Sequence, residues 1–323
     1  MTTQSLLFRR LCASLLLCAA LPACAADAGG LQQLRQVFEP SGAVQLADGR
    51  VLAVEDEAER AFNLLDFKNG SLHENEAADA ELLASFNREL SDLEALAQDG
   101  EGWIYAVSSH SETKQNERQA GREHLVRFKI QGNRAAGISY APNLKDALLQ
   151  NESVRRNIAA QTGGRRIDFH TMNIEGLHYD TAAKRLLLAL RDPLPLIVAV
   201  DNPQEVFGKG AAPKFGETVV LKLNGGGIRS LAYDPVLKTY LIANEITGSN
   251  GKGQSQLWAW NGRAASAPVA LNLPAAAELK NIEAVTPVNT GGKPYLLLMG
   301  DEGSAKKQRG ARYVLVDYGS LKK

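Results

Sequence analysis

Four charged residues stand in the same local setting, and each could do chemistry. Glu94, Glu175, Arg229 and Glu283 each follow leucine or isoleucine and precede a small residue and then leucine or valine. A carboxylate between apolar residues is costly to bury unless a proton, a cation or an arginine neutralises it. Because calcium prefers oxygen ligands, the three glutamates Glu94, Glu175 and Glu283 are a candidate Ca2+ site.

A second set of polar residues follows sixteen positions later, as His110, Arg191 and Glu245. Arg191, Arg229 and Glu245 are the candidate substrate-binding residues, with the arginines holding an anionic group. His110, in the segment SSHS, is the candidate catalytic base, because histidine exchanges a proton near neutral pH. Two other interpretations stay open: the arginines and glutamates form a structural salt-bridge ring, and His110 is a hydrogen-bonded structural residue.

The elements that must position these side chains are repeated hairpins. Each charged residue opens a segment that runs through a turn rich in Asp, Gly or Pro into a strand of Tyr, Leu, Ile and Val. Further strands follow, such as HLVRFKI and TVVLKL. Four strands per unit, repeated around a ring, predict a β-propeller. The first strand of each unit would lie nearest the axis, so the charged residues would project into one central opening.

The spacing of the copies predicts how many units there are. With Ala43 as the first position of the weakest copy, the successive intervals are 51, 81, 54 and 54 residues. The N-terminal residues before Ala43 would complete the last unit, which closes the ring. The long interval has a helical pattern near residues 143–162. We therefore expect an all-β, five-bladed propeller with a short helical insertion between the second and third repeats, and six blades is the alternative.

The N-terminal segment reads as a targeting signal. Residues 1–25 have a basic start and an apolar stretch ending in Ala23-Cys24-Ala25, which predicts a signal peptide. All three cysteines lie in it, so cleavage would leave no thiol chemistry. Residues 26–323 would form a single periplasmic or secreted propeller domain. The alternative is a protein lipid-anchored through Cys24.

Composition limits the partners. Lys+Arg and Asp+Glu both number 36, so no basic surface for nucleic acid is indicated. No membrane span is expected, and a monomer that binds a small anionic ligand or a periplasmic protein fits best. The run LNGGGIRSL lacks the lysine of a phosphate loop, and its glycines are expected to let the chain pass close to the axis.

The segments SDLEALAQDGEGWIYAVSSHS, NIEGLHYD and GGGIRSLAYD resemble a bacterial family of exported propellers known as domain of unknown function 3616. The resemblance runs from about Ser91 to Asp301. It extends more distantly to phytase-like, esterase-like propellers that share an EGL strand motif, whose glycine is replaced here by Ala95 and Ala284. The resemblance implies an exported β-propeller and hydrolysis of a phosphate or carboxylic ester, and it supplies no catalytic residues.

Two functions follow as hypotheses. The first is a metal-assisted hydrolase acting on phosphoester or ester substrates at the channel mouth. The second is a non-catalytic propeller that binds a ligand or a protein and uses the charged ring as internal support. The charge balance of the ring separates them, because a ring already neutralised by its arginines has no need of a further cation.

Overall fold

The computed structural model describes residues 30–248 and 253–321. The fold is all-β, with few helices, and its strands form four-stranded antiparallel sheets. The first sheet contains β2 (Pro40–Gln45), β3 (Val51–Glu55), β4 (Phe62–Lys68) and β5 (Ser71–His73), and the second contains β6 (Leu93–Gln98), β7 (Ile104–Ser108), β8 (Leu125–Gln131) and β9 (Arg134–Tyr140). The third contains β10 (Asn173–Asp180), β11 (Arg185–Asp192), β12 (Leu196–Val200) and β13 (Phe215–Val220), and the fourth contains β14 (Ile228–Asp234), β15 (Thr239–Thr247), β16 (Gly253–Trp260) and β17 (Val269–Leu271). The last contains β18 (Ile282–Thr290), β19 (Lys293–Gly300), β20 (Arg312–Asp317) and β1 (Gln32–Gln33).

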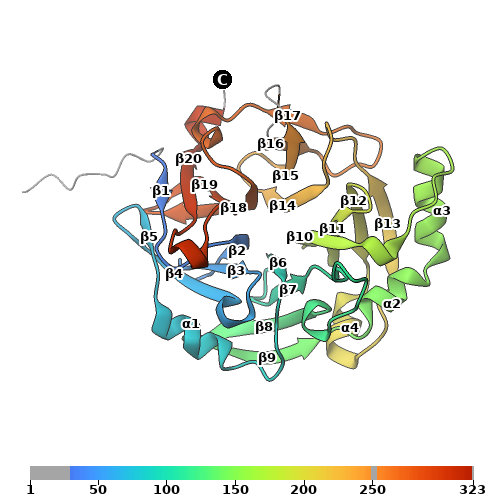
Figure 1. Ribbon diagram of the computed structural model, residues 1–323, viewed down its shortest axis with the longest axis horizontal. Helices are drawn as coiled ribbons and strands as arrows, with labels where there is room; N and C mark the ends of the chain where they lie inside the picture. Colours follow the sequence, from blue (N-terminus) through green and yellow to red (C-terminus); the bar gives the residue numbers. More distant parts are fainter. Residues whose placement is uncertain (1–29, 249–252, 322–323) are drawn as a thin grey trace, which may run out of the picture.

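The sheets stand around a common centre in a propeller-like arrangement (Figure 1). Their first strands, here called the inner strands, contact one another in cyclic order: β2, β6, β10, β14, β18 and again β2. The sheet that contains β18 combines both ends of the described chain, since Gln32 of β1 pairs with Tyr313 of β20. This pairing was expected from the short remainder at each end of the repeat.

The hydrophobic core lies between neighbouring sheets. Strand β12 reads LIVAV and is buried along its whole length, which is typical of a strand packed on both faces. One cluster joins Leu52 of β3 to Val126 of β8, and another joins Val107 of β7 to Leu188 of β11. Because each apolar layer is shared by two sheets, the position of every inner strand depends on both neighbours.

Helices lie outside the sheets. They are α1 (Glu76–Leu83), α2 (Leu144–Leu149), α3 (Glu152–Gln161) and α4 (Pro203–Lys209). Short 3-10 helices span Ala58–Arg60, Ala120–Arg122, Phe169–Thr171, Pro274–Ala276, Ala305–Lys307 and Tyr318–Leu321. The predicted helical insertion is confirmed as α2 and α3, where the side chain of Asn151 caps α3 by accepting from the Val154 amide.

Two further predictions concern the chain as a whole. In the described residues no helix is long and apolar enough to cross a membrane. The predicted signal peptide and the three cysteines lie outside the described ranges.

Candidate functional site

A β-bulge places one side chain of each inner strand at the centre. In β10, Ile174 pairs with Leu190 and Gly176 pairs with Ala189, so Glu175 is the extra residue of the strand. A bulge of this kind redirects a side chain out of the regular alternation. The other inner strands have the same irregularity, and the five bulged residues are Ser41, Glu94, Glu175, Arg229 and Glu283. We call these five positions the central ring.

The expectation that Ala43 is the fifth position was wrong. In β2, Pro40 pairs with Glu55 and Gly42 with Val54, so the bulged residue is Ser41. The interval to Glu94 is thus 53 residues rather than 51. The pair Ser41-Gly42 keeps the polar-then-small pattern of the other copies, without the charge.

The small residue after each ring position has a packing reason. A Cβ on Gly42 would lie 2.8 Å from the Ala95 Cα, and a Cβ on Gly176 would lie 3.0 Å from the Leu231 Cβ. Neighbouring inner strands therefore approach too closely for a large side chain. Alanine at Ala95 and Ala284, noted above as a departure from the motif, is still small and keeps the ring geometry.

Arginines neutralise one side of the ring. The Arg229 Nη1 donates to Glu175 Oε2 at 3.0 Å and to Glu283 Oε1 at 2.5 Å. Burial alone would lower the pKa of Arg229, but Glu283 and Glu175 outweigh it and raise that pKa. Arg191 Nη1 donates to Glu175 Oε1 at 2.8 Å, and Glu245 lies 3.6 Å from Arg229. Arg191 and Glu175, which are sixteen residues apart in the sequence, are therefore in direct contact.

Two asparagines also donate hydrogen bonds to the glutamates that contact the arginines, and the sequence pattern did not identify them. Asn173 Nδ2 donates to Glu175 Oε1 at 2.8 Å, and Asn281 Nδ2 donates to Glu283 Oε1 at 3.0 Å. Asn281 Nδ2 also donates to Asp301 Oδ2 at 2.8 Å. The signal was present in the segments MNIE and KNIE, where asparagine precedes the glutamate by two residues.

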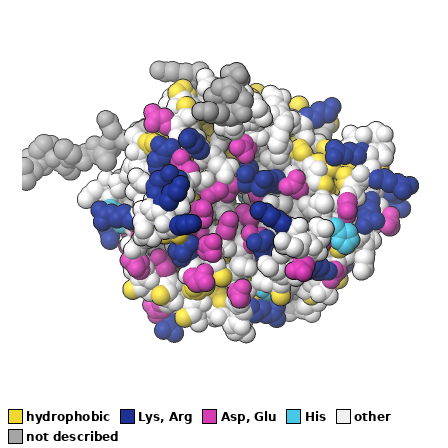
Figure 2. Space-filling view, in the orientation of Figure 1, with side chains coloured by type: hydrophobic (Ala, Val, Ile, Leu, Met, Phe, Trp, Pro, Cys, Tyr) yellow, Lys and Arg dark blue, Asp and Glu magenta, His cyan; other side chains and the backbone are white. Residues whose placement is uncertain are grey.

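Three further carboxyls at or beside the ring make no ion pair with an arginine of the described residues. We call Asp56, Glu94 and Asp301 the acidic half. Glu94 is 8% exposed, and no hydrogen bond or ion pair joins its carboxyl to another described residue. Burial raises the pKa of Glu94 well above its usual range, and the nearby Glu175 and Asp56 raise it further. Figure 2 shows acidic and basic side chains gathered around the centre of this face.

The other two carboxyls of the acidic half behave similarly. Burial raises the pKa of Asp56 to about 7, although the Ser41 hydroxyl donates to its Oδ1 at 2.8 Å and opposes that shift. Burial also raises the pKa of Asp301, with Glu39 adding to the effect. The carboxyls of the acidic half thus share a raised pKa, and burial likewise raises the pKa of Glu283 although Arg229 opposes that shift.

His110 does not line this opening. Its side chain is fully buried, its Nδ1 lies 2.8 Å from the Ser108 carbonyl oxygen, and its Nε2 has no partner among the described residues. Burial lowers the pKa of His110 to about 4. A backbone φ of 57° turns the side chain away from the strand direction. The structure therefore does not place His110 where a general base would meet a substrate.

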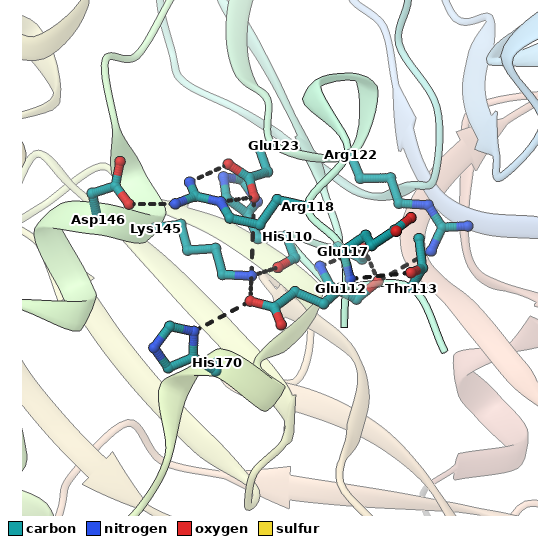
Figure 3. A network of polar contacts seen from close by, with 12 residues as sticks. His110, Glu112, Thr113, Glu117, Arg118, Arg122, Glu123, Lys145, Asp146 and His170 are labelled. Atoms are coloured by element: carbon teal, nitrogen blue, oxygen red, sulfur yellow. Dashed lines mark hydrogen bonds and ion pairs between the residues drawn. The ribbon is translucent and has the colours of Figure 1, made fainter. Parts of the chain in front are cut away.

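The surroundings of His110 are a structural network (Figure 3). Lys145 of α2 is buried, and its Nζ donates to the His110 carbonyl oxygen at 3.1 Å and to Glu112 Oε1 at 3.0 Å. His170 lies 3.3 Å from the same Glu112 oxygen. These contacts attach the helical insertion to the segment that follows β7.

Metal binding at the ring depends on how its acidic side chains are grouped. Within residues 30–248 and 253–321, no group of three or more His, Cys, Asp or Glu side chains is placed to hold a metal ion. Arg229 already supplies positive charge between Glu175 and Glu283. Calcium on Glu94, Glu175 and Glu283 stays a prediction.

A cavity continues along the axis beyond the ring. Its volume is about 280 Å³, and it is lined by residues of all five inner strands, among them Ser41, Leu177 and Thr286. His178 and Tyr233 line the same cavity and each packs edge-to-face with Tyr240, at a ring-centre distance of 5.3 Å. No Lys, Arg, Asp or Glu lines this axial cavity. The charged ring thus opens onto an uncharged chamber.

The raised pKa values predict how stability depends on pH. Between pH 6.5 and 8.5 the folded state, with the pKa of Asp56 and of Asp79 near 7, holds more protons than the unfolded state. The free energy of unfolding should therefore fall as pH rises through this window. Buried His110 and His178, with pKa values near 4, act in the opposite direction only at lower pH. Thermal melts at pH 6.5 and 8.5 test this, and Asp56→Asn should reduce the difference.

Comparison with known proteins gives shape alone. No protein-family model matches the chain, and no curated protein matches it. A PQQ-bound aldose sugar dehydrogenase from Streptomyces coelicolor is 16% identical over 88% of this chain and 98% of its own, with a TM-score of 0.40. The α-L-arabinofuranosidase PaAbf62A from Podospora anserina is 10% identical over 88% and 91%, with a TM-score of 0.46. At such scores the similarity carries no information about the activity of this chain.

Proposed function

We propose that the protein is an exported, closed five-bladed β-propeller that hydrolyses phosphoester or carboxylic-ester substrates at its channel mouth. The pairing of β1 with β20 and the cyclic contacts of the inner strands support the blade count. The observation that carries the activity is the unequal ring, in which one half is neutralised by arginines and the acidic half is not. Within it, Glu94 has no hydrogen-bond partner among the described residues, and buried carboxyls with raised pKa values are typical of groups that move protons in active sites.

The two halves suggest separate roles. Arg191 is 39% exposed, contacts Glu175 through Nη1 and lies 3.6 Å from Asp192 through Nε, so its Nη2 is the atom that can bind an anionic substrate group. Glu94 in its protonated form would give its proton to the leaving oxygen as the ester bond breaks. Asp301 in its ionised form would take the proton of the attacking water, which leaves one acid and one alcohol as products. The protonated Glu94 thus takes over the proton-transfer role first expected of His110.

The test is hydrolysis of p-nitrophenyl phosphate and p-nitrophenyl acetate by the mature domain. Glu94→Gln should lower kcat/KM by about 100-fold, because the amide cannot donate a proton as the acid does. Glu81→Gln is the matched control, since Glu81 lies on α1 and should leave the rate unchanged. Equal rates in wild type and Glu94→Gln would refute the role of Glu94.

A second candidate function is a non-catalytic binding propeller. Its support is the bridge from Arg229 to Glu175 and Glu283, which is the arrangement expected of internal structural charge. On this hypothesis neither ester would be hydrolysed by the wild-type domain, while ligand binding at the mouth would persist.

A further inference from the structure

We propose that the axial cavity is a second binding site, which opens at the end of the channel opposite the charged mouth and takes one small neutral ring with several hydroxyl groups. A single neutral sugar or cyclitol has this size and chemistry. The site is separate from the mouth, and the proposal does not depend on ester hydrolysis there.

The axial cavity reaches solvent at the ends of the inner strands, away from the ring. Its lining residues near the ring are buried, among them Ser41 and Leu177, and of the five ring residues only Ser41 lines it. The exposed lining residues lie where the inner strands end: Gln98 is the last residue of β6, Thr181 follows β10, and Tyr233 is next to last in β14. A ligand would therefore enter from the end that lacks the charged residues.

Backbone groups without a strand partner surround this cavity. Each inner strand is an edge strand of its sheet, so one of its two edges is unpaired. In an antiparallel pair, alternate residues direct their N–H and C=O groups to the partner strand, and the residues between direct theirs to the open edge. Neighbouring inner strands contact one another around the axis, but no ladder joins them in the described part of the chain. The open edges thus present both donors and acceptors, which need partners where they are buried.

The lining side chains add polar groups of the same double character. Ser230 and Thr286 line the cavity and are buried, and neither hydroxyl forms a hydrogen bond with another described residue. The ring nitrogens of His178 also have no such partner, and burial lowers the pKa of His178 to about 4, so the ring is neutral near pH 7. A hydroxyl and a neutral imidazole can each donate and accept a hydrogen bond.

These features together decide the ligand class. A charged ligand would lose its hydration in a cavity that no Lys, Arg, Asp or Glu lines, with no opposite charge to replace it. A wholly apolar ligand would leave the backbone N–H and C=O groups without partners. Hydroxyl groups donate, accept and carry no charge, so a neutral ligand with several hydroxyls satisfies both conditions.

An aromatic wall and the volume of the cavity limit the shape of the ligand. Tyr233 is 38% exposed near the open end, and its ring centre lies 6.1 Å from that of His178. Both rings pack against Tyr240, which holds them in place. The apolar face of an aromatic side chain can cover one face of a saturated ring. The volume of about 280 Å³ is below the roughly 300–1,000 Å³ of pockets for drug-sized ligands, so one ring fits.

The experiment is a titration of the mature domain with D-glucose and with myo-inositol, followed by saturation-transfer NMR of the ligand. At least one of the two should receive saturation from the protein and give a saturable Kd. Direct observation of the ligand is needed because sugars stabilise proteins unspecifically in thermal melts. At equal ionic strength D-glucuronate, which adds a carboxylate to the ring, should bind about tenfold more weakly, and so should cyclohexanol, which has one hydroxyl.

Two variants test whether the ligand lies in the axial cavity. Tyr233→Ala removes the aromatic wall and should raise the Kd by about tenfold. Thr286→Val keeps the shape of the side chain but removes its hydroxyl, and should raise the Kd by about fivefold. The matched control is Val269→Ala, because Val269 is 66% exposed on β17, the outermost strand of the sheet that contains Tyr233. This control should leave the Kd unchanged.

Several results would overturn the proposal. The first is no saturation transfer to either D-glucose or myo-inositol. The second is an unchanged Kd in both Tyr233→Ala and Thr286→Val, which would place the ligand elsewhere. The third is D-glucuronate or cyclohexanol binding as tightly as D-glucose, which would contradict a neutral, polyhydroxylated ligand. Hydrolysis of the p-nitrophenyl esters is a separate readout: sugar binding without hydrolysis would support this site and remove the proposed enzyme, and hydrolysis without sugar binding would do the reverse.

Discussion

Replacing Arg229 with methionine is expected to lower the free energy of unfolding by about 3–5 kcal/mol. The guanidinium is 13% exposed and bonds two carboxylates that are 2% and 5% exposed, those of Glu175 and Glu283. Without it, the buried Glu283 has no cation partner among the described residues, and Glu175 keeps only Arg191. Methionine keeps most of the side-chain volume, so the loss reports charge rather than a cavity. Urea denaturation of both proteins measures the difference.

The control for this change is Arg134→Met. Arg134 pairs with Glu81 at 2.7 Å, but its side chain is 72% exposed. Surface pairs of this kind contribute little to stability, so this variant should unfold at the wild-type urea concentration. An Arg229→Met protein as stable as wild type would mean that Glu175 and Glu283 are protonated or otherwise neutralised, and the ring would need a different charge assignment.

The repeated hairpins allowed the ring to be predicted because short turns fix register. Once Glu175 was placed at the start of a hairpin, Arg191 had to return beside it, and the structure has that contact. The same reasoning brought Glu245 near Arg229. Local sequence therefore contains much of the information on which charges meet.

What the pattern could not reveal is the bulge itself. An alternating strand pattern puts Ala43 on the same face as Ser41, and only the pairing of Gly42 with Val54 shows that the extra residue is Ser41. The asparagine donors were also missed, since a residue two positions earlier normally shares the face of the glutamate without contacting its carboxylate.

The burial of His110 could not be predicted from the sequence, for a different reason. His110 lies sixteen residues after Glu94, as do the other members of the second polar set after their ring residues, but its backbone has a positive φ and its carbonyl oxygen accepts from Lys145, a residue of the helical insertion. The burial of His110 depends on packing between segments far apart in the chain, and no local pattern reports it.

The glycine run before β14 leads to the second large expected effect. A Cβ on Gly227 would lie 2.0 Å from the carbonyl oxygen and 2.4 Å from the Cα of Arg191. Both atoms belong to backbone, which cannot swing aside as a side chain can. Gly227→Ala should therefore destabilise the protein by about 3 kcal/mol. The glycine thus allows close approach of two chain segments, whereas the sequence predicted a close approach to the axis.

Gly208→Ala is the matched control for Gly227→Ala. Gly208 lies in α4, and a Cβ there would meet nothing within 4 Å. Alanine in a helix reduces the entropy of the unfolded chain, so this variant should be as stable as wild type or more stable. Because Gly227 holds the backbone of Arg191 against β14, Gly227→Ala should also weaken the anion contact that Arg191 offers. A Gly227→Ala protein with wild-type stability and wild-type phosphoester KM would show that the two segments can separate without affecting the mouth.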